Sequence, residues 1–100
     1  MEEKNPKIME KLKSVIDPEV GANVVEMDMI QKAQIDENGV ATVEFVPTSN
    51  FCPIAFQIAA AIKKKILEVE GVHSAKVYCR GHMMEEQINK SVNENGDNSV

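Results

Sequence analysis

Apolar residues first recur at the spacing of one helical face near the start of the chain. Asn5-Pro6 precedes this run, and a capping side chain followed by proline in the first turn is typical of a helix start. Asp17-Pro18 closes the run, because proline disfavours the helical conformation in the residue before it. We therefore predict a first helix between these two signals. Its apolar positions are Ile8, Met9, Leu12, Val15 and Ile16.

A longer helical pattern occupies the second half of the chain. It begins at Pro53 and continues to about Val69, and Gly71 is the expected stop. The run Lys63-Lys64-Lys65 is expected to cover the solvent side of this helix. Its apolar stripe consists of Ile54, Ile58, Ile62 and Ile66, widened by Ala55, Ala59 and Leu67.

Three segments show the alternation of apolar and polar residues that predicts β-strands. After a short extended piece and a kink near Asp28, the first strand is expected from about Ile30. Asn38-Gly39 then predicts a hairpin turn, because both residues tolerate a positive φ angle. The returning strand is expected over residues 40–46, and a third strand over residues 72–79.

The order helix, strand, strand, helix, strand, short helix predicts a small single-domain α+β fold. A strand reached from another strand through a helix pairs with it in parallel, so we expect a three-stranded mixed sheet with helices on one face. A short last helix is predicted from the spacing of apolar residues between Met83 and Val92. We expect one domain over residues 1–90 and a disordered tail over residues 91–100.

Composition narrows the class of function. The chain has 100 residues, 43% of them hydrophobic, and a net charge of −5, which allows one small folded core. The negative charge argues against a nucleic-acid partner, because phosphate binding needs a basic face. No apolar run approaches the roughly 20 residues of a membrane span, and Met1-Glu2-Glu3-Lys4 lacks the apolar stretch of a signal peptide. We expect a cytoplasmic protein without a membrane partner.

The two cysteines, Cys52 and Cys79, are the first candidates for chemistry. A structural disulfide is not expected in a reducing cytosol. A zinc site of Cys52, His73, Cys79 and His82 is possible by count, but only Cys79-x-x-His82 has the close spacing of paired ligands. Cys79 shares the apolar side of its predicted strand, so core packing is the favoured interpretation.

Cys52 stands at a predicted helix start. With Pro53 at the first helical position, Cys52 is expected to be the last residue before the helix. Unpaired N–H groups and the positive end of the helix dipole favour a thiolate there, and the thiolate is the form that binds metals and attacks electrophiles. Burial as a small apolar residue at a strand-to-helix turn is the alternative.

Three motifs taken together resemble a known family. They are Asp17-Pro18-Glu19-x-Gly21 with Val24-Val25-Glu26, Thr48-x-x-x-Cys52-Pro53 at the head of a helix, and Gly71-Val72 before a strand. Their order and separation resemble the iron–sulfur cluster assembly domain of the PaaD and SufT type, over roughly residues 5–90. Two positions depart from the pattern. Asp28 stands where many relatives have Gly, and Gly81-His82-Met83-Met84 stands where a Pro-x-Trp element often occurs.

The resemblance implies an accessory role, not an enzymatic one, in assembling iron–sulfur clusters or delivering them to client proteins. It makes Cys52 the expected metal ligand and assigns Thr48, Asp17 and Glu19 to the cofactor-binding pocket around it. Clusters usually need four ligands such as thiolates, so one Cys52 per chain indicates transient binding of a cluster or of iron, with no permanently bound cofactor. The expected partners are the assembly machinery and client apo-proteins, and a homodimer would supply a second thiol.

Two other classes of function stay open. In a thiol-dependent enzyme Cys52 would be the nucleophile, which needs an activating base, and only His73 and His82 are available. In a pure interaction module, the domain would recruit clients or larger assembly complexes without using its thiol.

Overall fold

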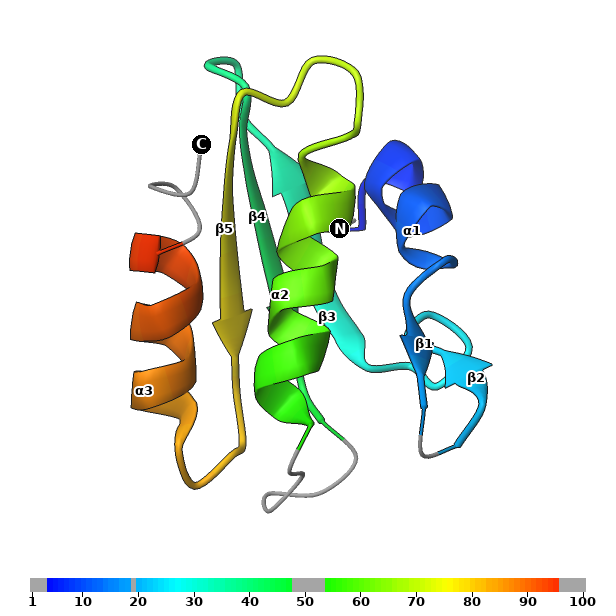
Figure 1. Cartoon of the computed structure of the whole chain (residues 1–100). Helices are drawn as coiled ribbons and strands as arrows, with labels where there is room; N and C mark the ends of the chain where they lie inside the picture. The colour runs from blue at the N-terminus through cyan, green and yellow to red at the C-terminus, as the bar shows by residue number, and fades with distance from the viewer. Residues whose placement is uncertain (1–3, 19, 48–53, 96–100) are drawn as a thin grey trace.

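The computed structural model describes residues 4–18, 20–47 and 54–95 of the chain. The elements are α1 Pro6–Leu12, β1 Ile16–Asp17, β2 Ala22–Asn23, β3 Ile30–Ile35, β4 Val40–Phe45, α2 Ala55–Ile66, β5 Ser74–Cys79, α3 Glu85–Lys90 and the π-helical η1 Ser91–Asn95. A three-stranded sheet in the order β3-β4-β5 is joined by a two-stranded sheet of β1 and β2 (Figure 1). This arrangement confirms the predicted α+β class.

The larger sheet is mixed, as predicted. β3 and β4 pair antiparallel across a turn in which Gly39 has a φ of +82°, and β4 and β5 pair in parallel. Apolar and polar residues do not alternate strictly along β3, because the register with β4 shifts between Ile30 and Lys32. This bulge adds one residue to β3, which lets Ile30 and Ala33 both turn into the core.

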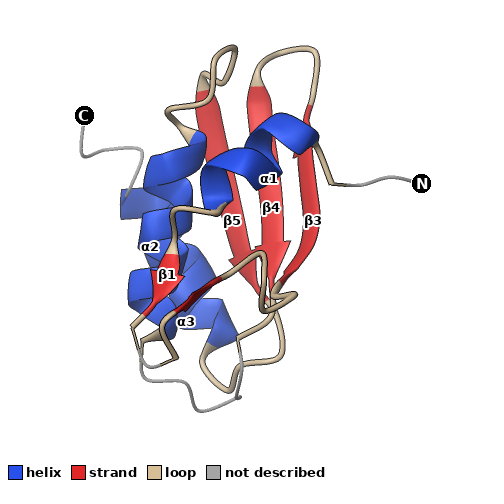
Figure 2. Ribbon diagram, turned by 90° about the vertical axis from the view of Figure 1, so that its right-hand side faces the viewer, coloured by secondary structure: helices blue, strands red, loops and turns tan. Residues whose placement is uncertain are grey.

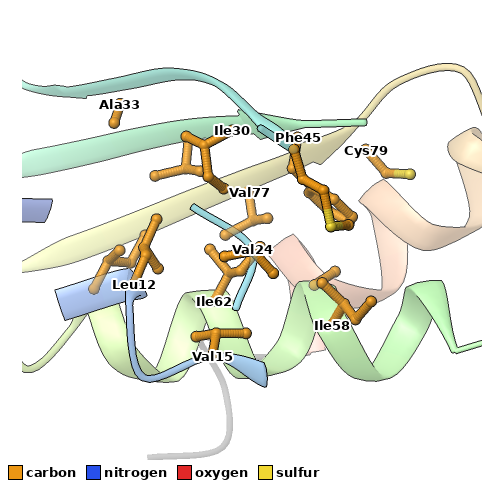
Figure 3. Packing of buried hydrophobic residues seen from close by; sticks show 14 of the residues in the cluster. Leu12, Val15, Val24, Ile30, Ala33, Phe45, Ile58, Ile62, Val77 and Cys79 are labelled. Atoms are coloured by element: carbon orange, nitrogen blue, oxygen red, sulfur yellow. The ribbon is translucent and has the colours of Figure 1, made fainter. Parts of the chain in front are cut away.

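α1 and α2 cover one face of this sheet, with the hydrophobic core between the two layers, and α3 runs beside the outer edge of β5 (Figure 1). α2 and α3 contact β5, while α1 contacts α2 and β3 (Figure 2). Figure 3 shows Phe45 and Val77 of the sheet facing Ile58 and Ile62 of α2. The buried inward positions of β4 and β5 are those that the alternation predicted: Ala41, Val43, Phe45, Ala75, Val77 and Cys79.

The first helix starts as predicted and ends earlier. Asn5 caps it, because its Oδ1 accepts the backbone N–H groups of Lys7 at 2.9 Å and Ile8 at 3.3 Å. The helix ends at Leu12, so the prediction that it continues to Asp17-Pro18 is wrong.

Strand pairing replaces the last predicted helical turn. Ile16 pairs with Asn23 in the β1–β2 sheet, and the N–H of Val24 donates to the carbonyl of Val15 at 3.0 Å. Ile16 is consequently 50% exposed, although its helical spacing had placed it on the buried face. Its predicted neighbour Val15 is buried as expected.

α2 differs from its prediction at two places. It begins at Ala55 with Ile54 as the N-cap residue, whereas the predicted start at Pro53 lies outside the described residues. Lys63 is only 4% exposed, and its Nζ donates to the carbonyl of Val92 at 3.0 Å. The lysine run therefore does not lie wholly on the solvent side, because its first member reaches across to the C-terminal helix.

The C-terminal helix crosses the boundary that we expected at residue 90. α3 continues into η1, and Val92 is buried in the core with 7% exposure. Residues 91–95 are therefore helical where a disordered tail was predicted, and residues 96–100 lie outside the described part. None of the helices in the described part is long and apolar enough to cross a bilayer.

Candidate functional site

The Thr48–Pro53 motif connects two elements whose positions are well defined. On one side, β4 ends at Phe45, and the N–H of Val46 donates to the carbonyl of Met29 at 2.8 Å. On the other side, α2 begins at Ala55. Thr48 and Cys52 themselves lie outside the described residues, so their predicted roles stay predictions.

The Asp17 segment is connected to described residues that come before and after that motif in the chain. A chain of backbone hydrogen bonds runs from Val15 through Val24 to Met29 and then to Val46, with donor–acceptor distances between 2.8 and 3.0 Å. On the other flank, Ile58 of α2 borders the same groove as Val15. The Asp17 segment is thereby linked to Val46 and Ile58, the described residues on either side of the Thr48–Pro53 motif.

Asp17 itself is enclosed in the fold. It ends β1 with 0% exposure, which is rare for a carboxylate. Its backbone carbonyl accepts the N–H groups of Val20 at 3.2 Å and Gly21 at 2.7 Å, and Gly21 has a φ of +84°. Asp17 is therefore a buried strand residue that holds a tight turn, not the helix stop that was predicted. Glu19 lies outside the described residues.

A shallow groove borders this segment and the first turns of α2. It has a volume of about 240 Å³ and is lined by Ile16 and Pro18 on one wall and by Gln57, Ala61 and Lys65 on the other. Ile16 is half exposed there. This wall of α2 was not among the predicted site residues, although Gln57, Ala61 and Lys65 recur every fourth residue, which is the signal of one helical face. The groove has both polar and apolar lining residues and lies between the Asp17 segment and α2.

Cys79 and the two histidines do not form a metal site with one another. Cys79 is 0% exposed, and Figure 3 shows it at the end of its strand in the core layer, which confirms core packing. His73 is exposed at the other end of β5, where its N–H donates to the carbonyl of Gly39 at 2.8 Å. Cys79 lies six residue steps further along the extended chain, which corresponds to about 20 Å.

His82 serves the start of α3. It is 8% exposed, and its Nδ1 accepts the N–H of Met84 at 3.0 Å while its carbonyl accepts the N–H of Glu85 at 3.0 Å. Within the described ranges, no three His, Cys, Asp or Glu side chains could together hold a metal ion. The Cys79-x-x-His82 spacing therefore reflects a strand end followed by a helix start.

Comparison with known proteins points to one family. A family model described as iron-sulfur cluster assembly protein matches residues 5–77. An uncharacterized protein of Methanocaldococcus jannaschii is 31% identical over 87 residues, covering 87% of this chain and 92% of its own. The Fe-S protein maturation auxiliary factor SufT of Staphylococcus aureus is 35% identical, covering 63% of this chain and 72% of its own. A corresponding auxiliary factor of Bacillus subtilis, YitW, is 32% identical, covering 71% and 70%.

Solved structures agree with these matches. A domain of unknown function from Bacillus anthracis superimposes with a TM-score of 0.68 at 30% identity, covering 86% of this chain and 84% of that one. A conserved hypothetical protein from Thermotoga maritima gives 0.63 at 25% identity, covering 96% and 98%. The resemblance found in the Asp17 and Cys52 motifs is thus confirmed over most of the domain: the chain belongs to the iron–sulfur cluster assembly protein family.

Proposed function

We propose that this protein is an accessory factor for iron–sulfur cluster assembly or transfer to client proteins, with the Cys52 thiolate as a transient ligand. Family membership carries this proposal. The named relatives are called maturation auxiliary factors, and one from Deinococcus radiodurans, 30% identical over 73 residues that make up 21% of its length, is called an iron-sulfur cluster carrier protein. These names describe auxiliaries and a carrier, in agreement with the expected non-enzymatic role. We place its action in the cytoplasm with the assembly machinery.

The thiol count supports a shared, transient site. The chain has two cysteines, and the side chain of Cys79 is closed off by the core. Cys52 is then the thiol available to bind a cluster, and its thiolate supplies one of the usual four ligands. The remaining ligands come from a donor, a client or a second copy, which suits a cargo that arrives and leaves.

The groove and the exposed residues near it are the proposed docking surface for a protein partner. Ile16 is 50% exposed and Val20 is 59% exposed, on either side of the enclosed Asp17. Exposed aliphatic side chains beside a reactive motif are typical of a protein contact surface. In this proposal Asp17 shapes the turn that presents this surface, and Thr48 and Glu19 complete the pocket around Cys52.

Anaerobic reconstitution tests the ligand role. The protein is loaded with iron and sulfide, and absorption spectra are compared for the wild type, Cys52→Ser and the matched control Cys79→Ala. Cluster absorption is expected in the wild type and the control and should be absent in Cys52→Ser. Transfer to an apo-protein acceptor is then followed with the loaded samples. Equal spectra for Cys52→Ser and the wild type would end the claim that Cys52 is a ligand.

The enzymatic alternative finds less support. His82 Nδ1 already accepts the Met84 N–H, and His73 lies beside Gly39 at the start of β4, while the motif follows the end of β4. A pure adaptor remains the second candidate, because the exposed Ile16 and Val20 favour docking whether or not the thiol acts. Full cluster transfer by Cys52→Ala in cells would favour the adaptor.

A further inference from the structure

The outer edge of β5 is closed by side chains of the C-terminal helix. Asn93 Oδ1 accepts the N–H of Val77 at 2.8 Å, and its Nδ2 donates to the carbonyl of the same residue at 3.0 Å. Asn89 makes the same pair of bonds with Cys79, at 2.6 and 3.3 Å. Each carboxamide thus does what a peptide group of a neighbouring strand would do.

The spacing explains why a helix can serve a strand edge. Residues four apart on a helix are separated by about 6.0 Å along its axis, and alternate residues of a strand by about 6.6 Å. The ladder continues by one more step, because Glu85 Oε1 accepts the N–H of Gly81 at 2.8 Å. Side chains 85, 89 and 93 therefore meet backbone positions 81, 79 and 77 in turn. We call residues 85–95, α3 with η1, the strap.

The groups that the strap covers are those an added strand would use. Arg80 N–H donates to the Phe45 carbonyl at 2.9 Å, so even-numbered residues of β5 bond β4 in this parallel pair. The N–H and carbonyl groups of Ala75, Val77 and Cys79 therefore face outward. Exposed strand edges of this kind template pairing with another chain.

The strap is anchored mainly by polar contacts. Besides the two carboxamide pairs, Lys63 Nζ bonds the Val92 carbonyl, and the buried apolar side chains of the strap are Ile88 and Val92. A six-residue α-helix with one further π-helical turn has little stability of its own. Short helices held by few buried side chains open at lower free energy than the core.

We propose that the outer edge of β5 is a strand-addition site that the strap keeps closed, and that its occupant after opening is the same edge of a second copy of this chain. Antiparallel pairing centred on Val77 brings the outward groups of all three odd-numbered residues together, with Ala75 opposite Cys79 of the second copy. This pairing is symmetric, so one strand edge supplies both halves of the interface.

Charge supports the second copy as the partner. The symmetric register sets Lys76 opposite Tyr78 of the second copy and Ser74 opposite Arg80 of the second copy. Like charges directly opposite one another destabilise a strand pair, and this register contains none among residues 74–80. Lysine beside an aromatic ring is a favourable cross-strand contact.

Full-length variants test the proposal by oligomeric state. The double variant Asn89→Leu, Asn93→Leu removes the carboxamide hydrogen bonds, and leucine has a high helix propensity, so the strap can still form a helix. Gln87→Leu is the matched control, because it removes an exposed amide from the same helix. Analytical ultracentrifugation should show a dimer dissociation constant for the double variant at least about tenfold below that of the wild type. The control should match the wild type.

The Cys79 thiol reports whether the strap opens. In a Cys52→Ser background, iodoacetamide labelling of Cys79 should be at least about tenfold faster in the dilute double variant, because labelling follows the population of the open form. Adding Ala75→Pro removes an outward N–H needed by the second copy, which an edge strand tolerates, and should restore the monomer while labelling stays fast.

Two results would overturn the proposal. The first is faster labelling of Cys79 in a double variant that stays monomeric at every concentration. The strap would then only cover the edge, or the edge would bind a partner other than a second copy. The other is a dimer that persists with Ala75→Pro, which would exclude this edge. If the double variant does not fold, Asn93→Leu alone replaces it and should shift both readouts in the same direction. Cluster loading through Cys52 is a separate measurement, so either proposal can fail alone.

Discussion

Gly39 and Gly21 have similar backbone conformations but differ in the space around them, which allows a matched comparison. Gly39 and Gly21 have nearly equal φ angles, +82° and +84°. An alanine Cβ at Gly39 would lie 2.9 Å from the carbonyl oxygen of Gly71 and would overlap the His73 ring, whereas at Gly21 no atom lies within 4 Å. Gly39→Ala and Gly21→Ala therefore share the backbone strain, and only the first adds a collision.

The expected magnitudes follow from these two terms. A left-handed conformation costs a non-glycine residue about 1–2 kcal/mol, and the reduced entropy of the unfolded alanine chain returns about 0.4–1 kcal/mol. Gly21→Ala should therefore lower the free energy of unfolding by about 1 kcal/mol. Gly39→Ala adds an overpacking cost of about 1–3 kcal/mol, since the Gly71 carbonyl belongs to the backbone and cannot rotate away.

Thermal and urea unfolding measure the difference. One kcal/mol corresponds to about 4–8 °C in Tm for a domain of up to 100 residues, so Gly39→Ala should melt at least about 4 °C below Gly21→Ala. His73→Ala in the Gly39→Ala background relieves the ring overlap and should recover part of the loss. Equal destabilisation by the two glycine substitutions would refute the packing of His73 and Gly71 against this turn.

Three further outcomes are expected. Iodoacetamide should modify Cys52 in the native protein and Cys79 only after denaturation, as mass spectrometry can show, because Cys79 is 0% exposed; rapid native labelling of both would contradict the packing. Lys63→Met should lower the free energy of unfolding by about 1–3 kcal/mol through the unpaired Val92 carbonyl, whereas Lys64→Met at an exposed site should change it by less than about 0.5 kcal/mol in urea titrations. Ile16→Glu should slow cluster transfer to an acceptor while leaving Tm within about 3 °C of the wild type, and unchanged transfer would remove the groove from the proposed docking surface.

Much of the fold could be predicted because its signals are local. The Asn5 cap, the Asn38-Gly39 turn and the alternation in residues 40–45 and 74–79 each act within a few residues. The parallel pairing of β4 with β5 follows from the helical connection between them, which returns the chain to the same end of the sheet. These features need no knowledge of distant neighbours.

The predictions were wrong where a residue distant in sequence determines the structure or burial of a position. Helical spacing placed Ile16 on a buried face, but pairing with Asn23 took it into a strand. The lysine run looked solvent-facing as a whole, but the Val92 carbonyl draws Lys63 inward. For the candidate site, the motif pattern named Asp17, and only the packing shows that this side chain is enclosed.

By itself the amino-acid order determined the α+β class, the strand pairing and the family, because periodicity, turn chemistry and motif spacing are written along the chain. Only the tertiary structure decided which polar side chains leave the solvent. Lys63 and Asn93 lie far along the chain from the backbone groups that they bond, and such bonds form only after the core has brought strand and helix together. The same assembly encloses Asp17 and closes the β5 edge, since the burial of these polar groups depends on the packed layers and not on a local pattern.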